Sequence, residues 1–394
     1  MLENSNLMKI LFIRNTGRFS GSETYDINLF KEFWRNKAIT ISFLTNLPAL
    51  AKRVAKIGFN AQIISWGEEG VGTKRQLVRA FFRLLVTIPR YLSTIRTLEK
   101  GKRFEYMCLQ SMTEKLFLTP ILKIKGYKII WTELGPIYAT QMSRAVTFLY
   151  KIISLYVDKI ITISKDTKND LINGGVERNK IVPVYIGIDT NIFKPPSKSE
   201  MSLLRKKFHI NPNTTVIGYL GTVTWQKGIE DFLAVSKALL KHSKNFHFIV
   251  IGDGELLNSI KASIKREKLS EYYLFTGFVE DVDVYLGVID VLLLPTHHYE
   301  GLSLAILEAQ SMGKVVITSN MGGNSEIIRN GKNGVIYKKL NVGTIAKTIE
   351  NLSNHKSKMV ALGAEARQNI VTRFNIRAQA KKFLKDIETY DYRR

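Results

Sequence analysis

The chain has little cysteine, no long apolar run and few acidic residues relative to its basic ones. Its single cysteine, Cys108, excludes a disulfide within the chain and fits a reducing compartment. No stretch reaches the ~18 uninterrupted apolar residues of a spanning helix, because the longest candidate, 145–163, is broken by two lysines and an aspartate. The first nine residues lack the apolar core of a signal peptide. We therefore expect a cytoplasmic protein that is soluble or bound at the inner membrane surface.

Size and composition indicate a folded protein with two domains. Apolar residues make up 45% of the chain and charged residues 23%, which is typical of globular rather than disordered proteins. At 394 residues the chain is too long for one ordinary core and has the length of two.

Basic residues outnumber acidic ones, and the net charge of +24 is concentrated toward the N-terminus. Residues 74–103 hold nine lysines and arginines against one acid, Glu99. Apolar residues in this segment recur at steps of three and four, and they predict one helical face made of Leu77, Phe81, Leu84, Leu85 and Ile88. Pro89 is expected to kink or divide the helix.

Two interpretations of residues 74–103 stay open. One is a helix that turns its apolar face to the core and its charges to water. The other is attachment to an anionic membrane surface, where each near-surface cation contributes ~1 kcal/mol. Nucleic acid is not an expected partner, because the chain carries no recognition motif for it.

Apolar, β-rich runs alternate with segments of helical length and period along nearly the whole chain, which favours a parallel α/β architecture. The predicted strands are 9–13, 39–44, 61–65, 105–109, 128–132, 159–163, 181–184, 215–220, 247–251, 272–276, 291–294 and 315–318. Among the helices expected between them are 165–173, 229–241, 255–268 and 303–312.

A domain boundary is expected where two prolines and small polar residues, at 193–199, interrupt both periodicities. We predict one Rossmann-like domain at 1–195, a second at 196–375, and a C-terminal helix within 376–394 that can return to the first domain. Two such halves imply parallel sheets facing across a cleft. Ligands of such sheets bind at the carboxyl ends of strands.

The most informative stretch joins the predicted strand 291–294 to a helix that begins near residue 302. Gly301 lets a backbone approach closely, and free N–H groups at 302–305 form an anion site where a diphosphate fits. Glu300 lies at the mouth of that site, and Glu308 lies ~12 Å further along a regular helix. Two such carboxylates can accept hydrogen bonds from sugar and ribose hydroxyls. They also repel phosphate, so a cation must lie nearby.

Lys227 is the candidate for that cation. It follows the strand predicted at 215–220 and a loop that begins with Gly221, and it precedes Gly228 and another helix. A lysine there can neutralise the charge that develops on a departing nucleotide diphosphate. The alternative is a solvated lysine near a helix start, because this pattern alone has low specificity.

Several motifs, taken in order, resemble those of the retaining glycosyltransferases of family four, which have the GT-B fold. The strongest is EGLSLAILEA at 300–309, which carries that family's two glutamates separated by seven residues. The other matching pieces are the glycine-to-lysine loop at 221–228, IGDG at 251–254, FTGFV at 275–279, GGNSEI at 322–327 and SGSE at 20–23.

The resemblance implies transfer of a sugar from a UDP- or GDP-sugar to a glycan or lipid-linked acceptor in cell-surface polysaccharide or lipopolysaccharide synthesis. The first domain would bind the acceptor and the second the donor. Glu300 would contact the transferred sugar, Lys227 the diphosphate and Glu308 the ribose. The implied donor contacts are completed by Gly21, Gly301, Leu302 and Ser303 along the phosphates and by Phe278 and Val279 beside the base.

Two departures from the family pattern concern charge and catalysis. Thr222 stands where the family usually has an arginine, so one phosphate cation is missing or comes from elsewhere. A histidine often found near the reacting sugar is also absent, and Glu133 occupies about that place. Glu133 is predicted to orient the acceptor hydroxyl in a front-face displacement, the alternative being a polar residue that merely ends a strand.

Neither a metal nor a cofactor beyond the nucleotide-sugar is expected. Asp281 and Asp283 are expected to cap the start of a helix, and the neighbours His297 and His298 lack spaced metal-ligating partners. Two rival functions stay open: a non-catalytic sugar-nucleotide-binding or scaffold protein, and a GT-B nucleotide-sugar epimerase.

Overall fold

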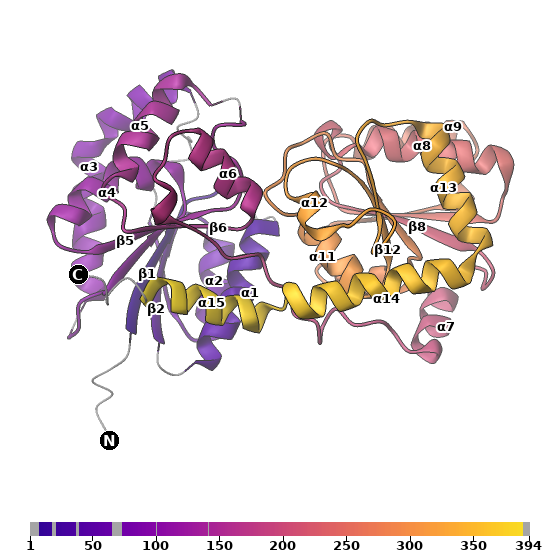
Figure 1. Cartoon of the computed structure of the whole chain (residues 1–394), viewed down its shortest axis with the longest axis horizontal. Coiled ribbons are helices and arrows are strands. Elements are labelled where there is room, and N and C mark those ends of the chain that lie inside the picture. The colour runs from indigo at the N-terminus through magenta and orange to yellow at the C-terminus, as the bar shows by residue number, and fades with distance from the viewer. Residues whose placement is uncertain are drawn as a thin grey trace. The chain divides into compact units, whose positions relative to one another are not determined.

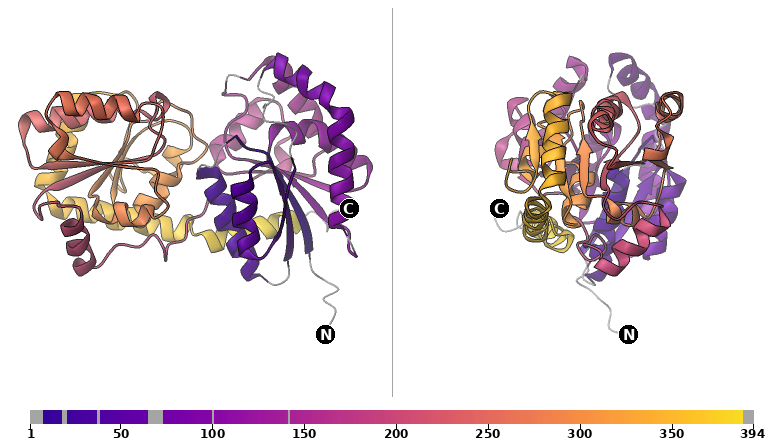
Figure 2. Two further views of the ribbon diagram at one scale, coloured as in Figure 1. Left: turned by 180° about the vertical axis from the view of Figure 1, so that it is seen from behind. Right: turned by 90° about the vertical axis from the view of Figure 1, so that its right-hand side faces the viewer.

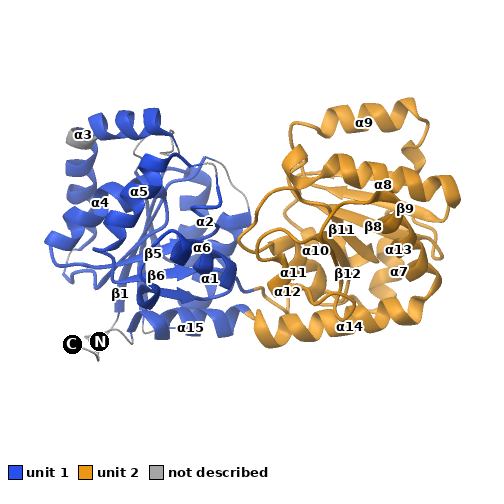
Figure 3. Ribbon diagram, turned by 45° about the horizontal axis from the view of Figure 1, so that its top comes forward, with its two compact units in different colours: residues 1–187, 376–394 blue, residues 188–375 orange. Residues whose placement is uncertain are grey.

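The computed structural model describes residues 8–17, 21–36, 39–64, 73–99, 101–140 and 142–388 (Figure 1). The chain divides into two compact units (Figure 3): unit 1 comprises residues 1–187 and 376–394, and unit 2 comprises residues 188–375. The sequence predicted a boundary after residue 195, whereas the structure places it after residue 187. The reason is that Ile188 already belongs to unit 2, where its N–H donates to the carbonyl of Phe374 at 2.8 Å.

Unit 1 contains a seven-stranded parallel sheet in the order β3-β2-β1-β4-β5-β6-β7, so the strand order reverses between β1 and β4. Its strands are β1 (Met8–Arg14), β2 (Ile39–Thr45), β3 (Asn60–Ile63), β4 (Tyr106–Leu109), β5 (Lys128–Glu133), β6 (Lys159–Thr162) and β7 (Ile181–Pro183). Its helices are α1 (Gly21–Arg35), α2 (Pro48–Ile57), α3 (Lys74–Leu98), α4 (Met112–Ile124), α5 (Arg144–Ser154), α6 (Lys165–Asn173) and α15 (Ile376–Glu388).

Unit 2 contains a six-stranded parallel sheet in the order β10-β9-β8-β11-β12-β13, with its reversal between β8 and β11. Its strands are β8 (Thr215–Leu220), β9 (Phe246–Ile251), β10 (Tyr273–Gly277), β11 (Val291–Leu294), β12 (Val315–Ser319) and β13 (Val335–Tyr337). Its helices are α7 (Lys198–Lys207), α8 (Ile229–His242), α9 (Leu257–Arg266), α10 (Val282–Val288), α11 (Leu304–Ser311), α12 (Asn324–Ile327), α13 (Val342–Asn354) and α14 (Lys356–Arg373).

The twelve predicted strands are all confirmed, each within two residues at either end. Central strands such as Val291–Leu294 are buried along their whole length, as expected where helices cover both faces of a sheet (Figure 2). The sequence missed β13, a half-buried edge strand of three residues that pairs only with β12. A run of three residues is too short to show a period.

The basic segment of the sequence forms one continuous helix, α3, with Pro89 inside it, so of the two outcomes expected at Pro89, a kink or a division, the division does not occur. Thr73 caps its N-terminus, because the Thr73 hydroxyl accepts from the N–H of Gln76 at 3.2 Å. No helix that the structure describes is long and apolar enough to cross a membrane.

The C-terminal helix α15 packs on unit 1 (Figure 1). The ring of Phe383 lies 6.2 Å from that of Phe12 in β1 and 5.5 Å from that of Phe33 in α1. These rings are fully buried, so α15 supplies part of the apolar layer on one face of the sheet.

Candidate active site

The two strongest candidates from the sequence, Lys227 and Glu300, lie at the carboxyl edge of the unit 2 sheet. Lys227 ends the short 3-10 turn η2 (Trp225–Lys227), which follows β8, and Glu300 lies in the loop that follows β11. β8 and β11 are the two neighbouring strands between which the strand order reverses. In open α/β sheets the crevice at such a reversal is the usual place for a ligand.

The structure brings these two side chains together. Lys227 Nζ donates to Glu300 Oε1 at 2.5 Å, and the two side chains keep 32% and 13% of their surface exposed. A lysine bound this way neutralises Glu300 and still faces solvent. The predicted pairing of a cation with the acidic loop is therefore present in the fold.

Close backbone contacts hold the two loops against each other. The carbonyl of Gln226 accepts from the N–H groups of His297 and His298 at 2.9 and 3.0 Å and from the hydroxyl of Thr296 at 3.1 Å. Gly228 has a φ of 72°, and a Cβ added there would lie 1.9 Å from the carbonyl oxygen of Pro295. Only glycine fits that position, and its absence of a side chain lets Lys227 reach Glu300.

A second glycine contact fixes the backbone of Glu300. The N–H of Gly323 donates to the carbonyl of Glu300 at 2.9 Å, and a Cβ on Gly322 would lie 1.9 Å from the same oxygen. Gly322 has a φ of 58°, in the left-handed region. Both glycines are therefore packed against the Glu300 loop.

The segment between Glu300 and α11 has the form expected of an anion site. Gly301, Leu302 and Ser303 are buried, and Ser303 occupies the N-cap position of α11 with an extended backbone. Its side chain makes no capping hydrogen bond. The first turn of α11 thus lacks the usual side-chain acceptor for its N–H groups, which an anion could replace.

Glu308 lies further along α11 in a different environment. Burial, with a smaller effect of the nearby Asp283 carboxylate, raises the pKa of Glu308 to about 8. In the described part of the chain Glu308 forms no ion pair with Lys227 or any other cation. The two glutamates thus differ: Glu300 forms an ion pair with a lysine, whereas Glu308 is a buried carboxyl that tends to keep its proton.

Phe278 and Val279 follow β10 at the same edge of the sheet. Phe278 is 64% exposed and Val279 is half-buried. Asp281 occupies the N-cap position of α10 but makes no capping hydrogen bond, contrary to the expectation that it caps this helix. Among the residues described, no group of three or more His, Cys, Asp or Glu side chains could hold a metal ion.

Comparison with known proteins places this geometry in a family. The model of glycosyl transferases group 1 matches residues 200–369, and that of glycosyltransferase family 4 matches residues 48–192. Together the two matches cover most of both units. The chain belongs to the family-four glycosyltransferases. Its fold, with two Rossmann-like units of parallel strands, is GT-B.

The relatives of this glycosyltransferase are distant. It is 25% identical to the UDP-Gal:alpha-D-GlcNAc-diphosphoundecaprenol alpha-1,3-galactosyltransferase of Escherichia coli, over 79% of this chain and 83% of that protein. It is 29% identical to the capsular polysaccharide biosynthesis glycosyltransferase CapM of Staphylococcus aureus, over 58% of this chain and 61% of the relative.

Solved structures of similar fold are more distant in sequence. The Anabaena protein Alr3699/HepE, solved in complex with UDP, superposes with a TM-score of 0.83 at 17% identity, over 97% of this chain and 100% of the other. A glycosyltransferase from Rickettsia africae superposes with a TM-score of 0.84 at 19% identity, over 99% and 100%.

In unit 1 of this glycosyltransferase, Gly21 is the exposed first residue of α1, and Ser20 lies outside the described residues. Glu133 ends β5 and is buried. Its Oε1 accepts from Lys115 Nζ at 2.6 Å and from the Tyr150 hydroxyl at 2.7 Å. Glu133 is thus half of a buried ion pair, and its role toward an acceptor stays a prediction.

Sequence reasoning missed Trp225 and Asp231, and it left His297 in the Glu300 loop without a partner. His297 Nε2 lies 2.5 Å from Asp231 Oδ2, and its ring stacks on Trp225 at 5.1 Å between centroids with planes 16° apart. Trp225 is 58% exposed. The sequence showed the histidine without a partner, because Asp231 belongs to the first turn of α8 and meets His297 only in the folded sheet.

Proposed function

We propose that this glycosyltransferase transfers a sugar from a UDP- or GDP-sugar, with retention of anomeric configuration, to a glycan or lipid-linked acceptor in cell-surface polysaccharide synthesis. The observation that carries the proposal is the Lys227–Glu300 pair at the reversal of the unit 2 sheet, beside the uncapped start of α11. A cation, a carboxylate and the amides of an uncapped helix start at one sheet edge are what a nucleotide diphosphate and its sugar require.

Each donor-site residue has a distinct part in this proposal. The diphosphate lies against the amides of residues 301–303 and takes Lys227 as its counter-ion. That move frees the Glu300 carboxylate for hydroxyls of the transferred sugar. Glu308 binds the ribose hydroxyls, and Phe278 and Val279 border the base.

The reaction is a displacement on one face of the sugar. The bond from the anomeric carbon to the phosphate oxygen breaks, the bond to the acceptor oxygen forms on the same face, and the acceptor's proton passes to the leaving phosphate. The protein contributes positioning and stabilises charge on the leaving group, chiefly through Lys227. No metal and no cofactor besides the nucleotide-sugar enters the proposal.

The relatives support the substrate class. Their names specify UDP-galactose with a diphosphoundecaprenol-linked acceptor in one case and GDP-mannose with a phosphatidylinositol mannoside in another. Capsule and O-antigen enzymes are among them. Structures of similar fold hold UDP and UDP-glucose. Because both nucleotides occur among relatives, the donor is proposed as either one.

The decisive experiment measures turnover rather than binding alone. UDP- and GDP-sugars are first ranked by thermal stabilisation, since a ligand stabilises according to its affinity. The best donors are then incubated with diphosphate-linked lipid saccharides, and proton NMR reads the anomeric configuration of the product. Retained configuration is expected. Binding without transfer would point to a scaffold protein, and donor isomerisation without an acceptor would point to an epimerase.

We further propose that the enzyme works at the cytoplasmic membrane surface through α3. Exposed on this helix are Val78, Phe81, Phe82 and Val86, together with Lys74, Arg75, Arg79 and Arg83. Its other face is buried through Ala80, Tyr91, Ile95 and Leu98. Of the two interpretations left open for this helix, the core-facing one does not account for Phe81, which is 62% exposed.

A helix with one buried face and a second face that is apolar and basic matches an interfacial membrane helix. Phe82 is 75% and Val86 70% exposed, so the apolar surface is open to a partner. α5, which contacts α3, likewise exposes Phe148 and Ile152. An anionic bilayer offers both the apolar layer and the negative charge that such a face requires.

A further inference from the structure

Three side chains outside the proposed donor contacts meet beside the ion pair of Lys227 and Glu300. The ring of His297, in the loop that leads to Glu300, stacks on Trp225 with 5.1 Å between centroids and planes 16° apart. His297 Nε2 lies 2.5 Å from Asp231 Oδ2. Trp225 begins η2, and Asp231 belongs to the first turn of α8. His297 therefore contacts the chain both before and after Lys227.

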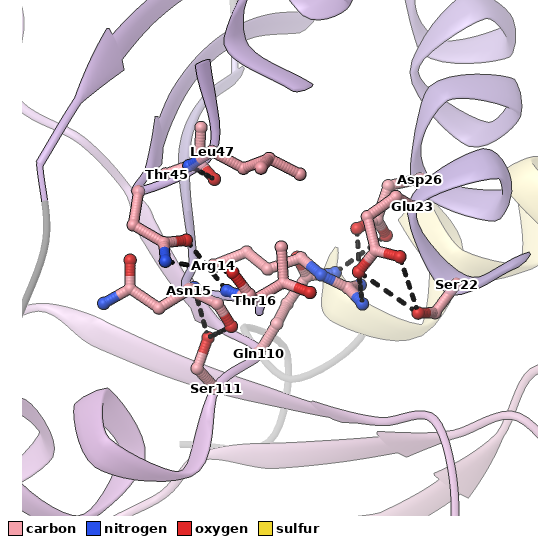
Figure 4. Close-up of polar contacts among 11 residues, drawn as sticks. Arg14, Asn15, Thr16, Ser22, Glu23, Asp26, Thr45, Leu47, Gln110 and Ser111 are labelled. Carbon is pink, nitrogen blue, oxygen red and sulfur yellow. Dashed lines mark hydrogen bonds and ion pairs between the residues drawn. The ribbon is translucent and has the colours of Figure 1, made fainter. Parts of the chain in front are cut away.

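The backbones of these loops are joined without the three side chains. The carbonyl of Gln226 accepts from the N–H groups of His297 and His298 at 2.9 and 3.0 Å. Polar contacts also join the strand ends at the reversal in unit 1, where the Ser111 hydroxyl accepts from the N–H of Asn15 at 2.5 Å and donates to its carbonyl at 3.0 Å (Figure 4). The stacked rings of unit 2 fix something more, which is the orientation of one loop relative to the other.

Asp231 commits the ring of His297 to one orientation. Asp231 Oδ2 is buried and has no hydrogen-bond partner in the part of the chain that the structure describes, so the ring of His297 is the polar group that faces it. Turning the ring away would leave a buried carboxylate oxygen with no polar neighbour, which is unfavourable. The imidazole is thus held by Asp231 at one nitrogen and by Trp225 across its face.

The turn η2 links the stacked rings to the lysine. It comprises only Trp225, Gln226 and Lys227, and Gly228 at its C-cap has a φ of 72° and packs on the carbonyl of Pro295. A turn this short moves as one body, so the orientation of Trp225 determines where the side chain of Lys227 begins.

We propose that Trp225, His297 and Asp231 are positioning residues of the transferase and form a clasp that holds Lys227 and Glu300 in place for the reaction. This inference rests on the proposed function, in which Lys227 stabilises the leaving diphosphate and Glu300 binds the transferred sugar. Misplacing a reacting or catalytic group by about 1 Å can lower a rate about 10²-fold. The clasp therefore acts on kcat, while the amides at the start of α11 remain to bind the diphosphate.

Trp225→Ala is the decisive variant, because Trp225 is 58% exposed and its truncation should leave the melting temperature nearly unchanged. We expect kcat to fall about tenfold and the donor KM to change less than about threefold. Trp225→Phe keeps a ring against His297 and should recover most of the turnover. The matched control is Tyr285→Ala, which breaks a stacked pair with Phe208 at the same 5.1 Å and should keep the wild-type kcat.

A double-mutant cycle tests whether the residues act as one unit. His297→Ala should lower kcat by about the same factor as Trp225→Ala, and the double variant by no more than either, because both changes remove the same contact. Asp231→Asn, which keeps the shape without the charge, takes the place of His297→Ala if that variant fails to fold. Wild-type kcat in Trp225→Ala, or losses that multiply in the double variant, would overturn the clasp.

A second readout needs no turnover. The folded chain is treated with acetic anhydride without nucleotide, and mass spectrometry gives the acetylation rate of Lys227 relative to Lys237, which pairs with Glu267. Loosening the pair with Glu300 should raise this relative rate about two- to fivefold in Trp225→Ala, since an exposed ion pair holds the ammonium only weakly. An unchanged relative rate would overturn the clasp.

The two readouts separate the clasp from the proposed function. A protein without turnover on any nucleotide-sugar would refute the proposed function and leave the acetylation readout intact. Conversely, a working transferase whose kcat is the same in Trp225→Ala and His297→Ala as in wild type would refute only the clasp.

Discussion

Lys227 and Glu300 form an ion pair across 73 positions of sequence, with 2.5 Å between Nζ and Oε1. Both belong to loops at the reversal of the unit 2 sheet, and three hydrogen bonds to the carbonyl of Gln226 hold these loops together. In the absence of a donor substrate, the charges of Lys227 and Glu300 balance each other. In the function we propose, a bound diphosphate takes Lys227 as its counter-ion and the lysine stabilises the charge of the leaving group.

Lys227→Ala and Glu300→Gln are each expected to lower turnover by about 10²–10³-fold, because we propose that Lys227 stabilises the leaving diphosphate and Glu300 binds the transferred sugar. The stability change should stay within about 1 kcal/mol, since the pair is partly exposed. The control is Lys237→Ala, which breaks the exposed pair with Glu267 in the same unit. Full turnover in both site variants, measured as nucleotide release, would contradict the assignment.

Gly228→Ala is expected to reduce both stability and turnover. Its Cβ would lie 1.9 Å from the Pro295 carbonyl, and its φ of 72° strains any L side chain. We expect a loss of more than about 2 kcal/mol in the free energy of unfolding. Gly343→Ala on α13, where the nearest atom is 3.6 Å away, should leave the melting temperature unchanged or slightly higher.

Glu308 should make stability depend on pH. Its pKa is raised from 4.5 to about 8 in the folded chain, so the folded state keeps a proton that the unfolded state has released. The contribution of Glu308 to the free energy of unfolding therefore falls as pH rises from about 4.5 to about 8 and is level above that.

Melting temperatures across that range test this dependence. Glu308→Gln should remove the fall in melting temperature that wild type shows as pH rises. Asp283→Asn should move the upper end of that fall to lower pH, because the Asp283 carboxylate is the second cause of the raised pKa of Glu308. Parallel pH curves for wild type and Glu308→Gln would show that Glu308 ionises normally.

Glu133→Gln is expected to destabilise unit 1 by about 3–5 kcal/mol, because it leaves the Lys115 ammonium buried without its partner. The double variant Lys115→Met/Glu133→Leu removes both charges and should recover most of the loss. Transfer activity then separates the two interpretations of Glu133. Recovery of transfer indicates a structural pair, whereas a stable but inactive double variant indicates that Glu133 orients the acceptor.

The exposed face of α3 predicts vesicle binding. Replacing Phe81 and Phe82 by Ser, or Arg75, Arg79 and Arg83 by Gln, should release the enzyme from phosphatidylglycerol vesicles in sedimentation assays. Added salt should weaken vesicle binding mainly because it screens the charges of the arginines. The control replaces Lys261, Lys265 and Arg266 by Gln, since these are exposed cations on α9. Equal sedimentation of all variants would indicate that α3 serves another partner.

Much of the fold follows from local patterns. Apolar runs as continuous as Val291–Leu294 can only be strands covered on both faces, and glycine at 228 and 301 marks where backbones approach. The order of motifs from the first strand to Glu308 likewise depends on residue type and spacing alone. Those features identify a GT-B glycosyltransferase and place Glu300 and Lys227 in one site.

Other features depend on contacts between segments far apart in the chain, which no local period encodes. The sequence treated Glu300 and Glu308 alike, but packing pairs one with Lys227 and buries the other near Asp283. It left open whether Phe81 faces the core or a surface, and only the fold shows Phe81 62% exposed while Ala80 and Tyr91 of the same helix are buried.

The contacts of His297 with Trp225 and Asp231 likewise form only when β8 and β11 become neighbours. The physical reason is that the carboxyl ends of neighbouring parallel strands meet at one edge of the sheet, whatever their distance along the chain.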